Sequence, residues 1–124
     1  MSIKNPHSFL AGVWDWGILR GCFGQTRIEP TDIDGLVERN GYFLVLEAKS
    51  PNAKVKTGQK ITFESMLKTG KFTVMIIYGQ QNQPEKVEVW TPHEKRTFDP
   101  AGTDMLKALV AQWFVYVEGL GKKK

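Results

Sequence analysis

The chain has 124 residues, which suffices for one domain; we expect that domain over residues 1–121, followed by a basic tail at 122–124. Hydrophobic residues make up 41% of the sequence, yet no apolar run has the length of a membrane span or signal sequence, which argues against a membrane protein and favours the cytoplasm. The net charge of +4, from 17 Lys and Arg against 13 Asp and Glu, permits nucleic-acid binding without requiring it. Cys22 is the single cysteine and the two histidines are far apart, so neither an internal disulfide nor a zinc site is expected.

The first expected element is a helix over residues 7–20. Apolar residues recur there at helical spacing and proline is absent, although two glycines weaken the pattern. Asp15 is the only acid in this segment and lies between two tryptophans. The ordinary interpretation is an exposed acid on an amphipathic helix whose tryptophans belong to the core.

Residues 31–50, TDIDGLVERNGYFLVLEAKS, are expected to form a β-hairpin. Asn40-Gly41 lies between two strand-like runs, and this dipeptide is the strongest short-range signal for a two-residue hairpin turn. Counting outward from the turn gives these antiparallel pairs: Arg39 with Tyr42, Glu38 with Phe43, Leu36 with Val45, Asp34 with Glu47, and Asp32 with Lys49.

Side chains alternate along a strand, so this register assigns every residue of the hairpin to a face. One face should be core and carries Ile33, Gly35, Val37, Tyr42, Leu44, Leu46 and Ala48. The other face ends, away from the turn, in three carboxylates and one ammonium group: Asp32, Asp34, Glu47 and Lys49. Facing carboxylates repel each other, and a divalent cation such as Mg²⁺, which takes one or two carboxylates plus water, would remove the conflict.

A simpler interpretation is that these charges are solvated strand ends and that the lysine blunts a sheet edge. Glu47 argues against it, because this carboxylate directly follows the apolar run 42–46. A carboxylate inside such a strand is costly without a partner.

The segment after the hairpin combines a basic loop with a helix. Lys54, Lys56 and Lys60 lie beside the acidic cluster and could contact a phosphate backbone, although a solvated loop would have the same composition. From Gly58, apolar residues recur at helical spacing as far as Gly70. Gln59 heads the face of this helix that should pack on the sheet, where its amide could bind a water, the lysine or a phosphate; a buried glutamine satisfied by backbone is the alternative.

Two strands and a long helix complete the expected fold. Residues 71–79 should be a fully buried strand and residues 87–91 a weaker one, with a surface turn at 80–85. The helix between the strands of Glu47 and Phe72 implies that these two strands pair in parallel. The final helix should be capped by Thr103, end at Gly119 and cover the other sheet face with this stripe: Leu106, Leu109, Val110, Trp113, Phe114 and Val117. The predicted fold class is therefore α/β, a mixed β-sheet sandwiched by helices.

The segment Pro30 to Gly35, PTDIDG, followed by Glu47-Ala48-Lys49, resembles the motif of the PD-(D/E)xK nuclease superfamily. It looks most like the small stand-alone phage and prophage members, in which the ExK strand is followed by a helix that starts with Gly-Gln, here Gly58-Gln59. The resemblance covers roughly residues 15–79, and it implies a restriction-endonuclease-like core. These motifs are short and match unrelated chains by chance, so their position at one end of a predicted hairpin is what supports them.

The resemblance implies a Mg²⁺-dependent DNA endonuclease, with Mn²⁺ able to substitute for the metal. Asp34, Glu47 and the main-chain carbonyl of Ala48 would bind the metal, Lys49 would orient the attacking water, and Gln59 would help to position either. Asp32 is the rival for the role of Asp34, because it stands closer to the proline as the motif requires.

The family also suggests additional features. A helix before the first strand often leans a carboxylate toward the metals, which would be the role of Asp15. So small a core suits a structure-selective enzyme, such as a junction resolvase or a phage DNA-processing nuclease, and cutting both strands would favour a homodimer. The alternative function is a nucleic-acid-binding module on the same fold that does not cleave. A nucleotide-handling protein unrelated to nucleases is less favoured, because no phosphate-binding glycine motif is present.

Overall fold

The computed structural model describes residues 14–122, and these divide between Pro30 and Thr31 into two compact units. The expectation of a single domain over residues 1–121 stays a prediction. Residues 123 and 124 of the expected tail lie outside the described residues.

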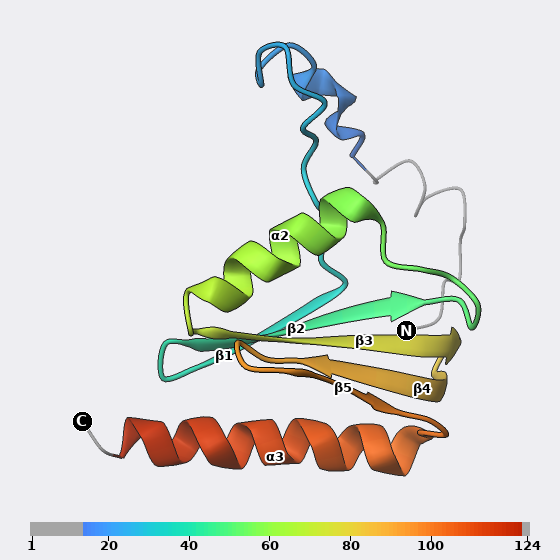
Figure 1. The fold of residues 1–124 in the computed structure, drawn as a ribbon, viewed down its shortest axis with the longest axis vertical. Coiled ribbons are helices and arrows are strands. Elements are labelled where there is room, and N and C mark those ends of the chain that lie inside the picture. Colours follow the sequence, from blue (N-terminus) through green and yellow to red (C-terminus); the bar gives the residue numbers. More distant parts are fainter. Residues whose placement is uncertain (1–13, 123–124) are drawn as a thin grey trace. The chain divides into compact units, whose positions relative to one another are not determined.

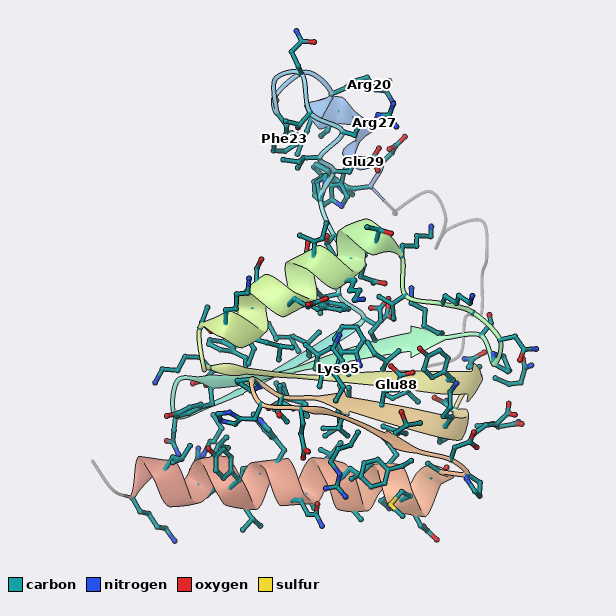
Figure 2. All side chains as sticks on the ribbon, in the orientation of Figure 1. Arg20, Phe23, Arg27, Glu29, Glu88 and Lys95 are labelled. Carbon is teal, nitrogen blue, oxygen red and sulfur yellow. The ribbon has the colours of Figure 1, made fainter. Side chains whose placement is uncertain are left out.

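The described part of the first unit contains one short 3-10 helix, η1 (Trp16–Leu19). The expected helix lies partly outside the described residues, and over the described remainder an α-helix is wrong, because the backbone leaves helical geometry at Arg20 with φ −56° and ψ 132°. Figure 2 labels Arg20, Phe23, Arg27 and Glu29 in this unit. Cys22 is a free cysteine and is exposed to solvent.

The second unit is a five-stranded mixed sheet between two helices, which confirms the α/β class (Figure 1). The strands lie in chain order: β1 (Gly35–Arg39), β2 (Tyr42–Lys49), β3 (Phe72–Gln80), β4 (Gln83–Trp90) and β5 (Lys95–Phe98). Helices α2 (Thr57–Lys68) and α3 (Thr103–Gly121) lie on opposite faces of the sheet. No helix within residues 14–122 is long and apolar enough to cross a membrane.

The β1–β2 hairpin has the predicted turn and register. Asn40 and Gly41 both have positive φ, 55° and 81°, as the tight turn requires. The ladder runs from Arg39 opposite Tyr42 to Gly35 opposite Leu46, in agreement with the predicted pairing. The register therefore follows from the position of the turn.

The crossover from β2 through α2 to β3 is also as predicted. Strands β2 and β3 are parallel, and α2 buries Phe63 and Leu67 against them. The helix starts at Thr57 and ends at Lys68, and Gly70, with φ 78°, turns the chain into β3.

The second half of the sheet departs from the predictions. The turn expected at 80–85 is only Gln81-Asn82, because strands β3 and β4 extend up to it. Strand β5, antiparallel to β4, was not predicted, since three of its four residues are polar. Thr103 does not cap α3, because the N-cap residue is Gly102, which has no side chain to accept a hydrogen bond. The helix also extends beyond Gly119 and ends at Gly121.

Each face of the sheet has its own hydrophobic core. Leu44, Met75 and Val87 pack under α3 with Leu109, Trp113 and Val117, whereas Val45, Val74 and Ile76 pack under α2 with Phe63 and Leu67. Six residues expected in the core are exposed instead: Trp14 and Trp16 of the first unit, Ile33 and Val37 of the outermost hairpin arm, Ala48 near the end of β2, and Phe114 at the side of the α3 stripe. The edge arm lacks a neighbouring strand, which explains its exposure.

Candidate active site

Three segments converge at the carboxyl end of β2. Glu47, Ala48 and Lys49 end the strand, Asp34 immediately precedes β1 on its antiparallel neighbour, and Gln59 lies in the first turn of α2. Ligands of open α/β sheets commonly bind at the carboxyl ends of parallel strands. The predicted hairpin register and crossover thus bring the predicted catalytic residues together.

Glu47 is a buried carboxylate, only 6% exposed, on the sheet face covered by α2. Gln59 Nε2 donates a hydrogen bond to Glu47 Oε2 at 2.5 Å, and Lys49 Nζ lies 3.4 Å from the same oxygen. The interpretation of Glu47 as a solvated strand end is therefore wrong.

Two buried acceptor oxygens at this point have no hydrogen-bond donor within the described part of the chain: Glu47 Oε1 and Gln59 Oε1. Leaving a buried polar atom unsatisfied is costly, and native structures seldom do so without a functional reason or a bound water or ion. Because both atoms are acceptors, the missing partner is a donor or a cation.

Burial raises the pKa of Glu47, and the negative charge of Asp34 raises it further. The hydrogen bonds from Gln59 and Lys49 lower the pKa but do not cancel the increase. The carboxylate thus stays ionised less readily than a free glutamate, and a positive charge at its unpartnered oxygen would reverse this penalty.

Asp34 is exposed, and its side chain binds the backbone of strand β2. Its Oδ2 accepts a hydrogen bond from Ala48 N at 2.8 Å, beyond the last backbone pair of the β1–β2 ladder. The next residue, Gly35, packs closely against Leu46, since a Cβ at that position would lie 3.3 Å from Leu46 Cβ. The side chain of Asp34 therefore lies next to Ala48, the residue that follows Glu47.

Asp32 is also exposed, but no hydrogen bond or ion pair is found for it among residues 14–122. Its neighbour Thr31 is held at α2, where the hydroxyl lies 3.3 Å from that of Thr62. The predicted pairs of Asp34 with Glu47 and of Asp32 with Lys49 are not part of the ladder, which begins at Gly35. Of the two aspartates, Asp34 is the one that contacts β2.

The predicted phosphate-binding lysines are all exposed near the start of α2. Lys54 and Lys56 precede the helix and have no ion pair within the described residues, whereas Lys60 Nζ lies 4.0 Å from Glu64 Oε1. Lys95 of β5 is 3.8 Å from the same carboxylate oxygen. Such exposed pairs are weak, so these lysines remain available to an anion.

Sequence reasoning missed two residues on the same face, Tyr78 and Lys86. In the parallel pair Lys49 is opposite Tyr78, and Tyr78 is opposite Lys86 on β4, so these three form a row across the sheet. Lys86 Nζ lies 4.3 Å from the centroid of the Tyr78 ring. Burial and the neighbouring Glu88 carboxylate raise the pKa of Tyr78 to about 12, which keeps its hydroxyl protonated at neutral pH. Alternation along β3 could have placed Tyr78 on the Glu47 face once the parallel pairing was assumed.

Glu88 itself has other contacts. Trp90 Nε1 donates to Glu88 Oε1 at 3.0 Å, and Lys95 Nζ lies 4.0 Å from the centroid of the Trp90 ring. Figure 2 labels Glu88 and Lys95 on this side of the sheet. Glu47 and Glu88 belong to one row across the sheet, and Ile76 of β3 lies between them, so its side chain separates the two carboxylates.

The donor set at Glu47 fits a hard cation better than a soft one. No group of three or more His, Cys, Asp or Glu side chains able to hold a metal ion is found among the residues that the structure describes. The available atoms are oxygens of Asp34, Glu47, Gln59 and the Ala48 carbonyl, and ions such as Mg²⁺ complete an incomplete protein shell with water. Of the two histidines, His7 lies outside the described residues, and His93 follows β4 in the turn to β5, away from Glu47.

Asp15 belongs to the first unit, where it serves as N-cap of η1 and its Oδ1 accepts from Gly17 N at 2.8 Å. Its expected role near the metals stays a prediction.

Comparisons of the chain with protein-family models, with curated proteins and with solved structures give no match. The resemblance to the PD-(D/E)xK superfamily therefore depends on the motif residues and on how the fold arranges them.

Proposed function

We propose that this protein is a metal-dependent endonuclease that hydrolyses phosphodiester bonds of DNA. The observation that carries the proposal is the buried carboxylate of Glu47, whose Oε1 lacks a donor within the described chain while Oε2 is held by Gln59 and Lys49. A strand end that only needed to be soluble would not bury a carboxylate and position an amide and an ammonium group on one of its oxygens.

In this proposal, Asp34, Glu47 and the carbonyl of Ala48 hold Mg²⁺ or, in its place, Mn²⁺. When bound, such an ion polarises a phosphoryl oxygen and lowers the pKa of a coordinated water. Asp32 is assigned no direct contact, because Asp34 is the aspartate that binds β2.

The protein side chains supply orientation and charge. Gln59 holds Glu47 Oε2 and leaves Oε1 without a donor among the described residues. Lys49, 15% exposed, brings its ammonium group to the same carboxylate, from which it can orient a water and stabilise the negative charge that develops on the phosphate. In-line attack by that water would leave a 5′-phosphate and a 3′-hydroxyl, as the family generally does.

The substrate class follows from charge and size. Exposed Lys54, Lys56 and Lys60 beside the site would contact backbone phosphates, which carry no sequence information. We therefore propose a structure-selective enzyme, of the kind that resolves junctions or processes phage DNA, and a homodimer where both strands are cut.

The test is cleavage of labelled DNAs (linear duplex, single strand, flap and four-way junction) with Mg²⁺, Mn²⁺ or EDTA. We expect metal-dependent cleavage by the wild type and a loss of about 10³-fold in Glu47→Gln, which removes the charge but keeps the shape of the side chain. Glu88→Gln is the matched control on the same face and should cleave at the wild-type rate.

Two results would contradict this proposal. If the folded wild type cleaves none of these DNAs with either metal but still binds one of them, the endonuclease proposal is wrong and the non-cleaving nucleic-acid-binding module replaces it. If Glu88→Gln loses as much cleavage as Glu47→Gln, the assignment of the site to Glu47 is wrong.

A further inference from the structure

A cavity of about 500 Å³ lies between α3 and the sheet. Its sheet residues come from the starts of β2 and β3, the end of β4, the β4–β5 turn and β5. Glu47 and Lys49 lie at the far end of β2 on the other face. A volume of several hundred Å³ is typical of small-molecule sites. The cavity is thus separate from the candidate active site.

The inner lining of this cavity is apolar and aromatic. Met75 of the sheet and Leu109, Trp113 and Val117 of α3 are all buried, and the half-buried Phe98 completes the wall from β5. An aromatic wall favours a flat, apolar ligand body over an extended polar one.

Two basic side chains belong to the same lining, and both lie against aromatic rings. Lys71 Nζ is 4.4 Å from the centroid of the Tyr42 ring and 3.4 Å from its hydroxyl, and Arg96 Cζ is 5.1 Å from the centroid of Phe98. No ion pair of Lys71 is found within residues 14–122.

Glu94 is the one carboxylate among the lining residues that the structure describes. Its Oε1 is 4.0 Å from Arg96 Nε, and both side chains are more than half exposed, at 61% and 62%. Such a pair contributes little in water, so Arg96 can still bind an anion. The lining therefore combines an apolar aromatic interior with excess positive charge.

We propose that this cavity binds a small aromatic anion. The ring system would occupy the space beside Trp113 and Phe98, and the anionic group would be bound by Lys71 and Arg96. This inference is independent of the nuclease proposal, because the cavity contains none of the residues assigned to DNA cleavage.

The probe is 8-anilinonaphthalene-1-sulfonate, an aromatic sulfonate whose fluorescence rises in apolar sites. We expect saturable binding to the folded full chain and weaker binding of its uncharged analogue N-phenyl-1-naphthylamine. The double variant Lys71→Gln/Arg96→Gln should bind the sulfonate about tenfold more weakly, because charge-assisted contacts are lost. Lys107→Gln/Lys122→Gln removes two exposed charges outside the cavity, one within α3 and one at its C-cap, and should bind like the wild type.

A second variant tests the cavity itself. Gln112→Trp places a bulky ring on an exposed position of α3 that lines the cavity, and it should reduce sulfonate binding while circular dichroism shows an unchanged fold. Displacement of the probe by thymidine monophosphate would indicate that the anion is a nucleotide, and displacement by indole-3-acetate would indicate an aromatic carboxylate.

Four results would overturn the proposal: no sulfonate binding by the folded wild type, equal binding of the uncharged analogue, equal weakening in the two double variants, or no displacement by either competitor.

Discussion

On the face of the sheet covered by α2, strand β2 buries Val45 and then Glu47, whereas on the face covered by α3 the same strand buries Leu44 and half-buries Leu46. Alternation of side chains gives both faces the same opportunity to bury a charge. Glu47 is nevertheless the only buried charged residue found in the described part of the chain.

The difference between the faces lies in the donors that each helix supplies. Helix α2 begins beside the end of β2, so Gln59 in its first turn reaches the carboxylate of Glu47. Helix α3 instead places Leu109, Trp113 and Val117 against the sheet. The α2 face therefore holds a charge at the end of β2, whereas the core of the α3 face is apolar. Each of the following variants tests one of these two faces.

The largest expected effect is on the α2 face. Lys49→Ala should reduce DNA cleavage about 10³-fold, because an ammonium group that stabilises charge on the phosphate is lost, while DNA binding changes little. Lys68→Ala, an exposed lysine in the last turn of α2, is the control. Cleavage at the wild-type rate by Lys49→Ala would show that this lysine has no part in the chemistry.

The next effect belongs to the α3 face. Trp113→Ala should lower the free energy of unfolding by about 3–5 kcal/mol, since it empties a large volume in the core, measured by urea denaturation. Tyr116→Ala, 64% exposed one turn along the helix, should change it by only about 0.5 kcal/mol. At a temperature where both variants are folded, cleavage should be unchanged, and its loss in Trp113→Ala alone would mean that the two faces are coupled.

Sequence reasoning succeeded where local chemistry determines the geometry. The dipeptide Asn40-Gly41 fixes the turn and hence every pair of the β1–β2 ladder, and this register brought Asp34 beside the end of β2. The helix that follows required a parallel neighbour, which the structure confirms. The converging part of the candidate site could be predicted because it depends on these two features.

Predictions were wrong where contacts with other segments of the chain determine the structure. Strand β5 has three polar residues of four and is ordered by pairing with β4, which no local pattern indicates. Thr103 is a good capping residue, but the chain places Gly102 at the N-cap. The orphaned oxygen of Glu47 also depends on the packing of α2 on the sheet and could not be read from spacing.

A subtler effect follows from the raised pKa of Glu47. A carboxyl group whose folded-state pKa is raised contributes stability that is fully present below its unfolded pKa and is lost as the pH rises through the folded pKa. Without metal, Glu47→Gln should therefore be more stable than the wild type at neutral pH, and the difference should disappear below about pH 4.

Thermal unfolding between pH 3.5 and pH 8, with and without Mg²⁺, measures this difference. Mg²⁺ should raise the melting temperature of the wild type at neutral pH and leave that of Glu47→Gln unchanged, because binding to the folded state stabilises it. A wild type that is more stable than Glu47→Gln at neutral pH without metal would show that Gln59 and Lys49 fully compensate the buried charge.

The smallest effect concerns the contact of the hairpin turn with α3. Asn40 Nδ2 donates to the Val117 carbonyl at 3.1 Å, so Asn40→Asp should cost about 1 kcal/mol by removing the donor while keeping a residue that tolerates positive φ. Asn82, in the β3–β4 turn with φ 56°, supplies the matched control, because its side chain is exposed. If Asn82→Asp were as destabilising as Asn40→Asp in urea denaturation, the cost would lie in the turn conformation, and the contact with α3 would contribute nothing to holding the hairpin that carries Asp34 and Glu47.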